Sequence, residues 1–171
     1  GPDSQVVFLT DNNALLGEVK DEVVKQMTQL PFKDNAAKSL ENSMLILLSS
    51  ITDCIAFSNL YAPEHLILAV KDAPSASELI QNAGSVFLGN FSCESAGDYA
   101  SGTNHTLPTN GFARAYSGLS IDSFVKKITF QELSAEGIAA LGPVIEIMAE
   151  AETLFAHKNS VSVRLKSIKN D

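Results

Sequence analysis

Lysine and arginine are scarce in this sequence. Its 171 residues contain 12 Lys and Arg against 20 Asp and Glu, which gives a formal net charge of -8 at pH 7. Proteins that bind nucleic acids neutralise phosphates with clustered Lys and Arg. The densest basic stretches here are Lys126–Lys127 and the terminal Arg164–Lys169, and a basic terminal run is usually a solvated tail. We therefore expect no nucleic-acid partner and no binding to an anionic membrane surface.

Cysteines and long apolar segments are also few. Cys54 and Cys93 lie far apart and match no metal-binding or redox spacing, so we expect reduced, intracellular thiols. No apolar run approaches the ~20 residues that a membrane-spanning helix needs. The chain opens with Gly1–Ser4 instead of a basic start and an apolar stretch, so we expect no signal peptide. Together these absences predict a cytoplasmic protein.

Short apolar runs alternate with stretches of helical spacing. Hydrophobic residues make up 45% of the chain and charged residues 19%, which is typical of a globular protein with a core. The pattern predicts strands at 6–10, 44–48, 66–70 and 85–88, and helices at 13–30, 35–42, 50–60 and 74–81. Such alternation is typical of parallel β-α-β units. The sequence therefore predicts an α/β fold with a three-layer, Rossmann-like parallel sheet that is incomplete in its strands.

Residues 90–120 follow a different pattern. They contain four glycines, a proline and many Ser, Thr and Asn residues, which is typical of a loop. A loop this long in a compact domain is usually functional or disordered, and its acidic, imidazole and hydroxyl groups favour function. We expect an α/β domain with this catalytic loop at 1–120 and a C-terminal helical arm at 121–171.

The expected arm begins with a helix capped by Ser134, with Glu136 in its first turn. Apolar residues continue at helical spacing to Phe155, and Pro143 is expected to divide this stretch into two helices. Alternating apolar residues at 161–165 indicate that the chain could end in a strand.

The three histidines, His65, His105 and His157, all lie in polar, turn-like or helix-end settings, which favours function. Glu64 and His65 precede an expected strand, where a carboxylate and an imidazole can act as acid and base. A helix-start Glu beside a capping His is an equally good interpretation, and both stay open. Asp98 and His157 suit zinc, although no local spacing connects them.

Familiar catalytic motifs are absent. The sequence contains neither HExxH nor GxSxG. The glycines of Gly97–Gly102 do not follow a strand directly and open a helix, as a dinucleotide site requires. Spacing alone therefore predicts an α/β domain with a chemically rich loop and no more specific function.

Longer stretches of the sequence indicate a protein family far more specifically than these short motifs do. The strings YAPEHL (Tyr61–Leu66), NAGSVFLG (Asn82–Gly89) and GDYASGTNHTLPTNGFAR (Gly97–Arg114) resemble signatures of the histidinol dehydrogenase family. The opening Gly1–Val6 and the C-terminal Ala151–Asn159, with Ala-Glu followed by Ala-His-Lys-Asn, are similar to that family as well. The resemblance runs through essentially the whole chain, in order.

The resemblance implies an activity and residue roles. The family oxidises L-histidinol twice, with two NAD, through an enzyme-bound aldehyde to L-histidine, in histidine biosynthesis. By resemblance, His65 is the general base, Glu64 activates water for the second oxidation, and Asp98 and His157 bind zinc. Zinc in this family orients the substrate by its imidazole and amine. The residues implied to contact the substrate are His65, Asp98, His105, Glu152 and His157.

The family pattern also extends beyond this segment. Its Gln and His zinc ligands, and the region that binds most of the NAD, precede the segment that begins here at Gly1. The resemblance thus assigns no NAD-binding residue to this chain. It places two of about four zinc ligands, Asp98 and His157, within the chain. The family's active site is shared across a homodimer, so we expect 121–171 to be a dimerisation arm.

Two hypotheses follow for function. In the first, the chain is part of an active histidinol dehydrogenase and is inactive alone, because it begins too late in the family pattern. In the second, it is a truncated, catalytically inactive α/β module that only folds and dimerises. An alcohol dehydrogenase with zinc acting on the alcohol is less favoured, because it would need thiolate ligands and Cys54 and Cys93 lie outside ligand positions.

Overall fold

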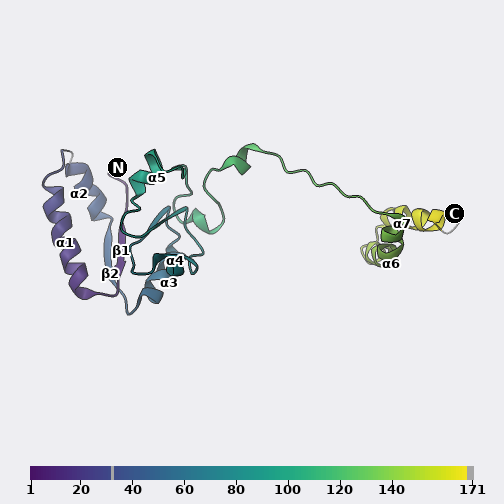
Figure 1. The fold of residues 1–171 in the computed structure, drawn as a ribbon, viewed down its shortest axis with the longest axis horizontal. Coiled ribbons are helices and arrows are strands. Elements are labelled where there is room, and N and C mark those ends of the chain that lie inside the picture. The colour runs from purple at the N-terminus through teal and green to yellow at the C-terminus, as the bar shows by residue number, and fades with distance from the viewer. Residues whose placement is uncertain (32, 169–171) are drawn as a thin grey trace. The chain divides into compact units, whose positions relative to one another are not determined.

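The chain folds into two compact units, Gly1–Phe124 and Val125–Asp171. The computed structural model describes residues 1–31 and 33–168. The first unit contains all the strands and most of the helices, and the second contains a pair of helices (Figure 1).

The strands of the first unit pair in parallel. β1 (Val7–Thr10) pairs with β2 (Met44–Leu47), and β3 (His65–Leu68) pairs with β4 (Ser85–Leu88). Helical connections between the paired strands make the parallel arrangement possible. All four strands lie where the apolar runs predict them, so the α/β prediction is confirmed. The structure arranges them as two two-stranded sheets within the described residues.

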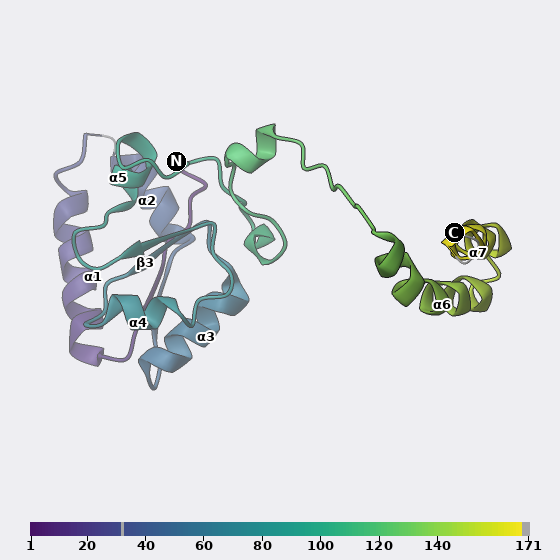
Figure 2. The ribbon, with the colours of Figure 1, turned by 45° about the vertical axis from the view of Figure 1, so that its right-hand side comes forward.

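Helices α1 (Asn13–Met27) and α2 (Lys33–Glu41) connect β1 to β2, and α1 packs along that strand pair (Figure 2). α1 begins after Asn12, whose Oδ1 accepts hydrogen bonds from the backbone amides of Ala14 and Leu15. This cap confirms the predicted start of the helix. The helix ends at Met27, short of the predicted end at residue 30, and Phe32 is outside the described residues.

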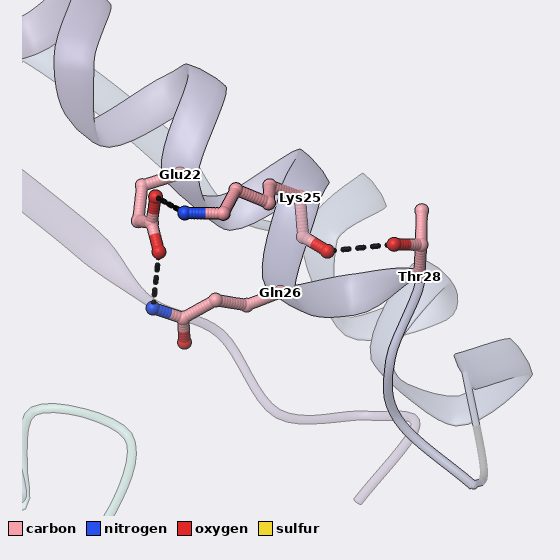
Figure 3. A network of polar contacts seen from close by, with 4 residues as sticks. All are labelled: Glu22, Lys25, Gln26 and Thr28. Atoms are coloured by element: carbon pink, nitrogen blue, oxygen red, sulfur yellow. Dashed lines mark hydrogen bonds and ion pairs between the residues drawn. The ribbon is translucent and has the colours of Figure 1, made fainter.

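An exposed polar network covers the last turns of α1 (Figure 3). The Glu22 carboxylate accepts hydrogen bonds from Lys25 Nζ and Gln26 Nε2, both at 2.9 Å. Hydrogen bonding from Gln26, and then from Lys25, lowers the pKa of Glu22. The Thr28 hydroxyl donates to the Lys25 carbonyl at 2.7 Å. These residues form a solvated helix face.

Helix α3 (Ile51–Tyr61) begins at Ser50, whose Oγ accepts from the Asp53 amide at 3.1 Å. Helix α4 (Ala73–Ser77) is shorter than the predicted 74–81, and Glu78 lies at its end. Asn59 explains the early end: its side chain donates to the Leu79 carbonyl and accepts from the Gln81 amide. These bonds replace those that a longer helix would form.

The predicted loop at 90–120 is partly helical. It contains α5 (Glu94–Tyr99) and the 3₁₀ turn η1 (Phe112–Arg114), and a second 3₁₀ turn, η2 (Ile121–Phe124), follows it. Glycine is usually a helix breaker, which is why the sequence predicts a loop here. In the structure, Gly97 allows α5 to lie against Phe87, because a Cβ at this position would come within 2.6 Å of the Phe87 ring.

The second unit is a pair of helices, α6 (Ala135–Ala151) and α7 (Phe155–Ile168). Ser134 caps α6 as predicted, with its Oγ accepting from the Gly137 amide at 3.1 Å. The division predicted at Pro143 is wrong, because α6 continues through it and the chain turns later, at Thr153, whose φ is +60°.

The strand considered for residues 161–165 is also wrong, since these residues are helical. Val161 is buried, and Leu165 packs against Gly142 of α6 so closely that a Cβ on Gly142 would come within 2.8 Å of Leu165. This packing between the helices outweighs the strand preference of valine.

The hydrophobic core is small. Buried apolar side chains in the first unit include Ile55, Leu68 and Phe87, but no large side chain among the described residues is fully buried. Many large apolar side chains are exposed, including Phe91 and Phe130. Within the part of the chain that the structure describes, no helix has the length and apolar character needed to cross a membrane.

Candidate active site

The turn between α3 and β3 positions Glu64 and His65. Ala62 ends α3 with a φ of +55°, is 1% exposed, and donates its backbone amide to the Ser58 carbonyl at 2.8 Å. A left-handed alanine is strained, and its burial indicates that the surrounding packing holds the turn in place. The chain therefore enters β3 directly at the two residues that the sequence singled out.

Backbone hydrogen bonds from the start of β4 also hold the backbone at Glu64 in place. The backbone amides of Gly84 and Ser85 donate to the carbonyls of Pro63 and Glu64, both at 2.9 Å. A Cβ on Gly84 would lie 2.5 Å from the Glu64 carbonyl oxygen, so only glycine fits there without movement of the backbone. Two strands thus fix the backbone at Glu64.

His65 lies beside Asp98. The His65 Nε2 and Asp98 Oδ1 atoms are 3.6 Å apart, and the two side chains are 24% and 23% exposed. The imidazole stacks on Phe87, with ring centroids 6.0 Å apart. Nε2 is buried and has no hydrogen-bond partner among the described residues. This half-buried imidazole therefore has an acidic neighbour and an available nitrogen.

Glu94 joins the same cluster, although no sequence motif singles it out. Potential metal-ligating atoms of His65, Glu94 and Asp98 all lie within 4.8 Å of one another. Glu94 and Asp98 are four residues apart on α5, a spacing that places side chains on one face of a helix. The four-residue spacing is visible in the sequence, but it places two side chains on one face only in a helix. Because the sequence predicts a loop here, the spacing did not identify Glu94 as a site residue.

His105 lies in the segment after α5 and is exposed. The segment closes on itself where the Leu119 amide donates to the Thr106 carbonyl at 3.0 Å. Arg114 fastens it to α3 by donating to the Leu60 carbonyl. An open pocket of about 600 Å³ lies beside the start of β4, and its lining includes Gly84, Ser85, Thr103, Asn104, Leu107 and Phe124.

Glu152 and His157 belong to the second unit. Glu152 ends α6, His157 lies in the first turn of α7, and both are exposed. The Lys158 ammonium pairs with the Glu150 carboxylate at 2.5 Å across the turn between the helices. The first unit therefore brings His65 and Asp98 together, while Glu152 and His157 flank a separate turn.

These features define an α/β protein with a histidine at the start of a strand and two carboxylates close to it, a cluster suited to acid–base or metal chemistry. The family model described as histidinol dehydrogenase matches residues 1–165. Since that match covers most of the chain, the chain belongs to the histidinol dehydrogenase family.

Individual relatives agree with this assignment. The histidinol dehydrogenase of Bacteroides thetaiotaomicron is 54% identical over 169 residues, covering 99% of this chain and 40% of that protein. The chloroplastic histidinol dehydrogenase of Arabidopsis thaliana is 52% identical, covering 98% of this chain and 36% of that protein. The chain thus spans about two-fifths of the length of the curated relatives that it matches.

A solved structure is similar as well. The crystal structure of histidinol dehydrogenase from Elizabethkingia anophelis matches with a TM-score of 0.94 and 63% sequence identity. The match covers 99% of this chain and 39% of that one. The α/β fold is therefore the fold of the corresponding part of a histidinol dehydrogenase.

Proposed function

We propose that this chain is part of an L-histidinol dehydrogenase that oxidises L-histidinol to L-histidine in two NAD-dependent steps, in the cytoplasm. Family membership supports the proposal, and the observation that carries it is the approach of His65 Nε2 to Asp98 Oδ1 at 3.6 Å within the family signatures. The activity is assigned to the whole protein, because this chain covers about two-fifths of its relatives.

His65 and Glu64 move the protons. In the first oxidation, His65 would take the hydroxyl proton of the alcohol at Nε2, and NAD, when bound, would accept the hydride from the alcohol carbon. That nitrogen is the candidate because no hydrogen bond within the described residues occupies it. In the second oxidation, Glu64 would remove a proton from the water that adds to the aldehyde, and a second NAD would accept the hydride from the resulting hydrate. Stacking on Phe87 orients the imidazole.

The residues present fit a zinc ion. Carboxylate oxygens are common zinc ligands, and oxygens of Glu94 and Asp98 lie within 4.8 Å of each other on α5. We assign Asp98 and His157 as zinc ligands. Zinc, when bound, orients the imidazole and amine of the substrate. Glu152 and His105 complete the substrate contacts, and no NAD-binding residue is assigned to this chain.

The second unit acts as a dimerisation arm in this proposal. Its helix α6 exposes a row of apolar side chains, which include Val144, Ile147 and Met148. An exposed apolar row of this kind supports an interface between subunits. His157 then serves the active site of the partner subunit in a homodimer.

The test is histidinol-dependent NADH formation by the purified chain with zinc and NAD, alone and mixed with the upstream segment of a relative. We expect turnover only in the mixture, because the upstream segment supplies the missing zinc and NAD residues. No turnover in the mixture would favour the alternative, a catalytically inactive module that folds and dimerises. Turnover by the chain alone would contradict the assignment of essential residues to the upstream segment.

A further inference from the structure

The short helix α5 places the carboxylates of Glu94 and Asp98 close to each other and to His65. Glu94 and Asp98 lie one helical turn apart, and both are half-buried. Their ligand atoms lie within 4.8 Å of each other and of a His65 nitrogen. No Lys or Arg side chain forms an ion pair with either carboxylate within residues 1–31 and 33–168.

This arrangement is unfavourable without a cation. Two like charges at this separation repel, and partial burial strengthens the repulsion by lowering the effective dielectric constant. A divalent cation between them converts the repulsion into attraction. The resemblance implies that Asp98 binds zinc but assigns no role to Glu94.

We propose that Glu94 strengthens zinc binding at Asp98 by supplying a second negative charge from the same helix face. The inference rests on the proposed function, since it assumes zinc at Asp98. Glu94 is a positioning residue, because it acts through the cation and through Asp98. The structure explains the spacing: Gly97 seats α5 against Phe87, which turns both carboxylates toward His65.

The experiment titrates the full 171-residue chain, mixed with the upstream segment of a relative that supplies the remaining zinc ligands, with zinc in competition with a chromophoric chelator. The variants are Glu94→Gln, Glu94→Asp and Asp98→Asn, with Glu78→Gln as the control, because Glu78 is an exposed carboxylate at the end of α4. We expect Glu94→Gln to weaken zinc binding about tenfold or more, as loss of a supporting partner at a metal site does. Glu94→Asp, which keeps the charge, should retain most of the affinity, and the control should bind like the unaltered chain.

The thermal unfolding midpoint of the metal-free chain distinguishes an effect of the Glu94 charge from an effect of Glu94 on packing. Since Glu94→Gln removes a repulsion, its metal-free midpoint should equal or exceed that of the unaltered chain. A lower midpoint together with weaker binding would show a structural role and overturn the inference. Zinc binding at full strength in Glu94→Gln would overturn it too, as would an unaltered chain that binds no zinc.

Asp98→Asn separates this inference from the proposed function. If Asp98→Asn weakens binding and Glu94→Gln does not, the inference fails and the zinc role of Asp98 stands. If Asp98→Asn also binds zinc like the unaltered chain, the zinc ligand assigned under the proposed function fails with it.

Discussion

At the scale of the residue, two glycines bring the site together. Gly84 lets β4 approach the Glu64 carbonyl, where a Cβ would lie at 2.5 Å. Gly97 lets α5 approach Phe87, which in turn stacks on His65. The chemistry of the site thus depends on positions that carry no side chain at all.

His65→Asn in the intact protein is expected to lower turnover by about 10²- to 10⁴-fold, because asparagine cannot accept the substrate proton. Zinc content, measured by elemental analysis, should stay unchanged, since His65 acts as a base and not as a ligand. His157→Asn is the matched comparison and should lose zinc. Loss of zinc in His65→Asn would contradict the separation of base and ligand roles.

The two free cysteines should differ in reactivity. Burial, and then the charges of Asp11 and Asp53, raise the pKa of the Cys54 thiol, so less thiolate is present at pH 8. Cys93 is exposed. We expect iodoacetamide to label Cys93 first in the native chain, with both residues labelled at similar rates in urea. Peptide mass spectrometry would show this order, and rapid native labelling of Cys54 would contradict its burial.

At the scale of the element, local signals predicted beginnings better than ends. Ser134 caps α6 as expected, and Asn12 and Ser50 cap α1 and α3 close to the predicted starts of those helices, because a cap depends on residues close in sequence. The errors at α5 and α7 share a cause. In α5 and α7, packing against Phe87 and against α6 overrides the local preference for a loop or strand.

The close contact of α5 leads to a stability prediction. Gly97→Ala should destabilise the chain by about 1–3 kcal/mol, because the added Cβ would meet the Phe87 ring at 2.6 Å and Thr103 Oγ1 at 2.7 Å. Gly17→Ala is the matched control in α1, where a Cβ meets nothing within 4 Å. It should stabilise the chain by about 0.5–1 kcal/mol. Urea unfolding measures both, and equal effects would argue against the tight α5 packing.

At the scale of the whole molecule, many large apolar side chains are exposed in both units, while few are buried. Side chains such as Ile121, Ile128 and Phe130 are more than two-thirds exposed, at 79%, 70% and 91%. Exposed apolar surface of this extent is typical of interfaces. It agrees with a chain that spans about two-fifths of its relatives and whose activity we assign to a larger assembly.

The proposed dimerisation arm can be tested by oligomeric state. We expect the chain to self-associate, and Ile147→Lys to shift it toward monomer, because Ile147 is 69% exposed in the apolar row of α6. Ser167→Lys places the same charge at an exposed polar position of α7 and should leave association unchanged. Sedimentation velocity distinguishes these results. Association unaffected by Ile147→Lys would remove α6 from the interface.

The sequence by itself determined the strands, the helix caps and the family, because apolar runs, capping residues and signature strings are local features. It also singled out Glu64, His65 and Asp98. Only the tertiary structure decided that Asp98 lies 3.6 Å from His65 and that Glu94 joins them. That proximity arises because α5 packs on β4 through Gly97 and Phe87. The local sequence pattern of neither segment predicts this contact.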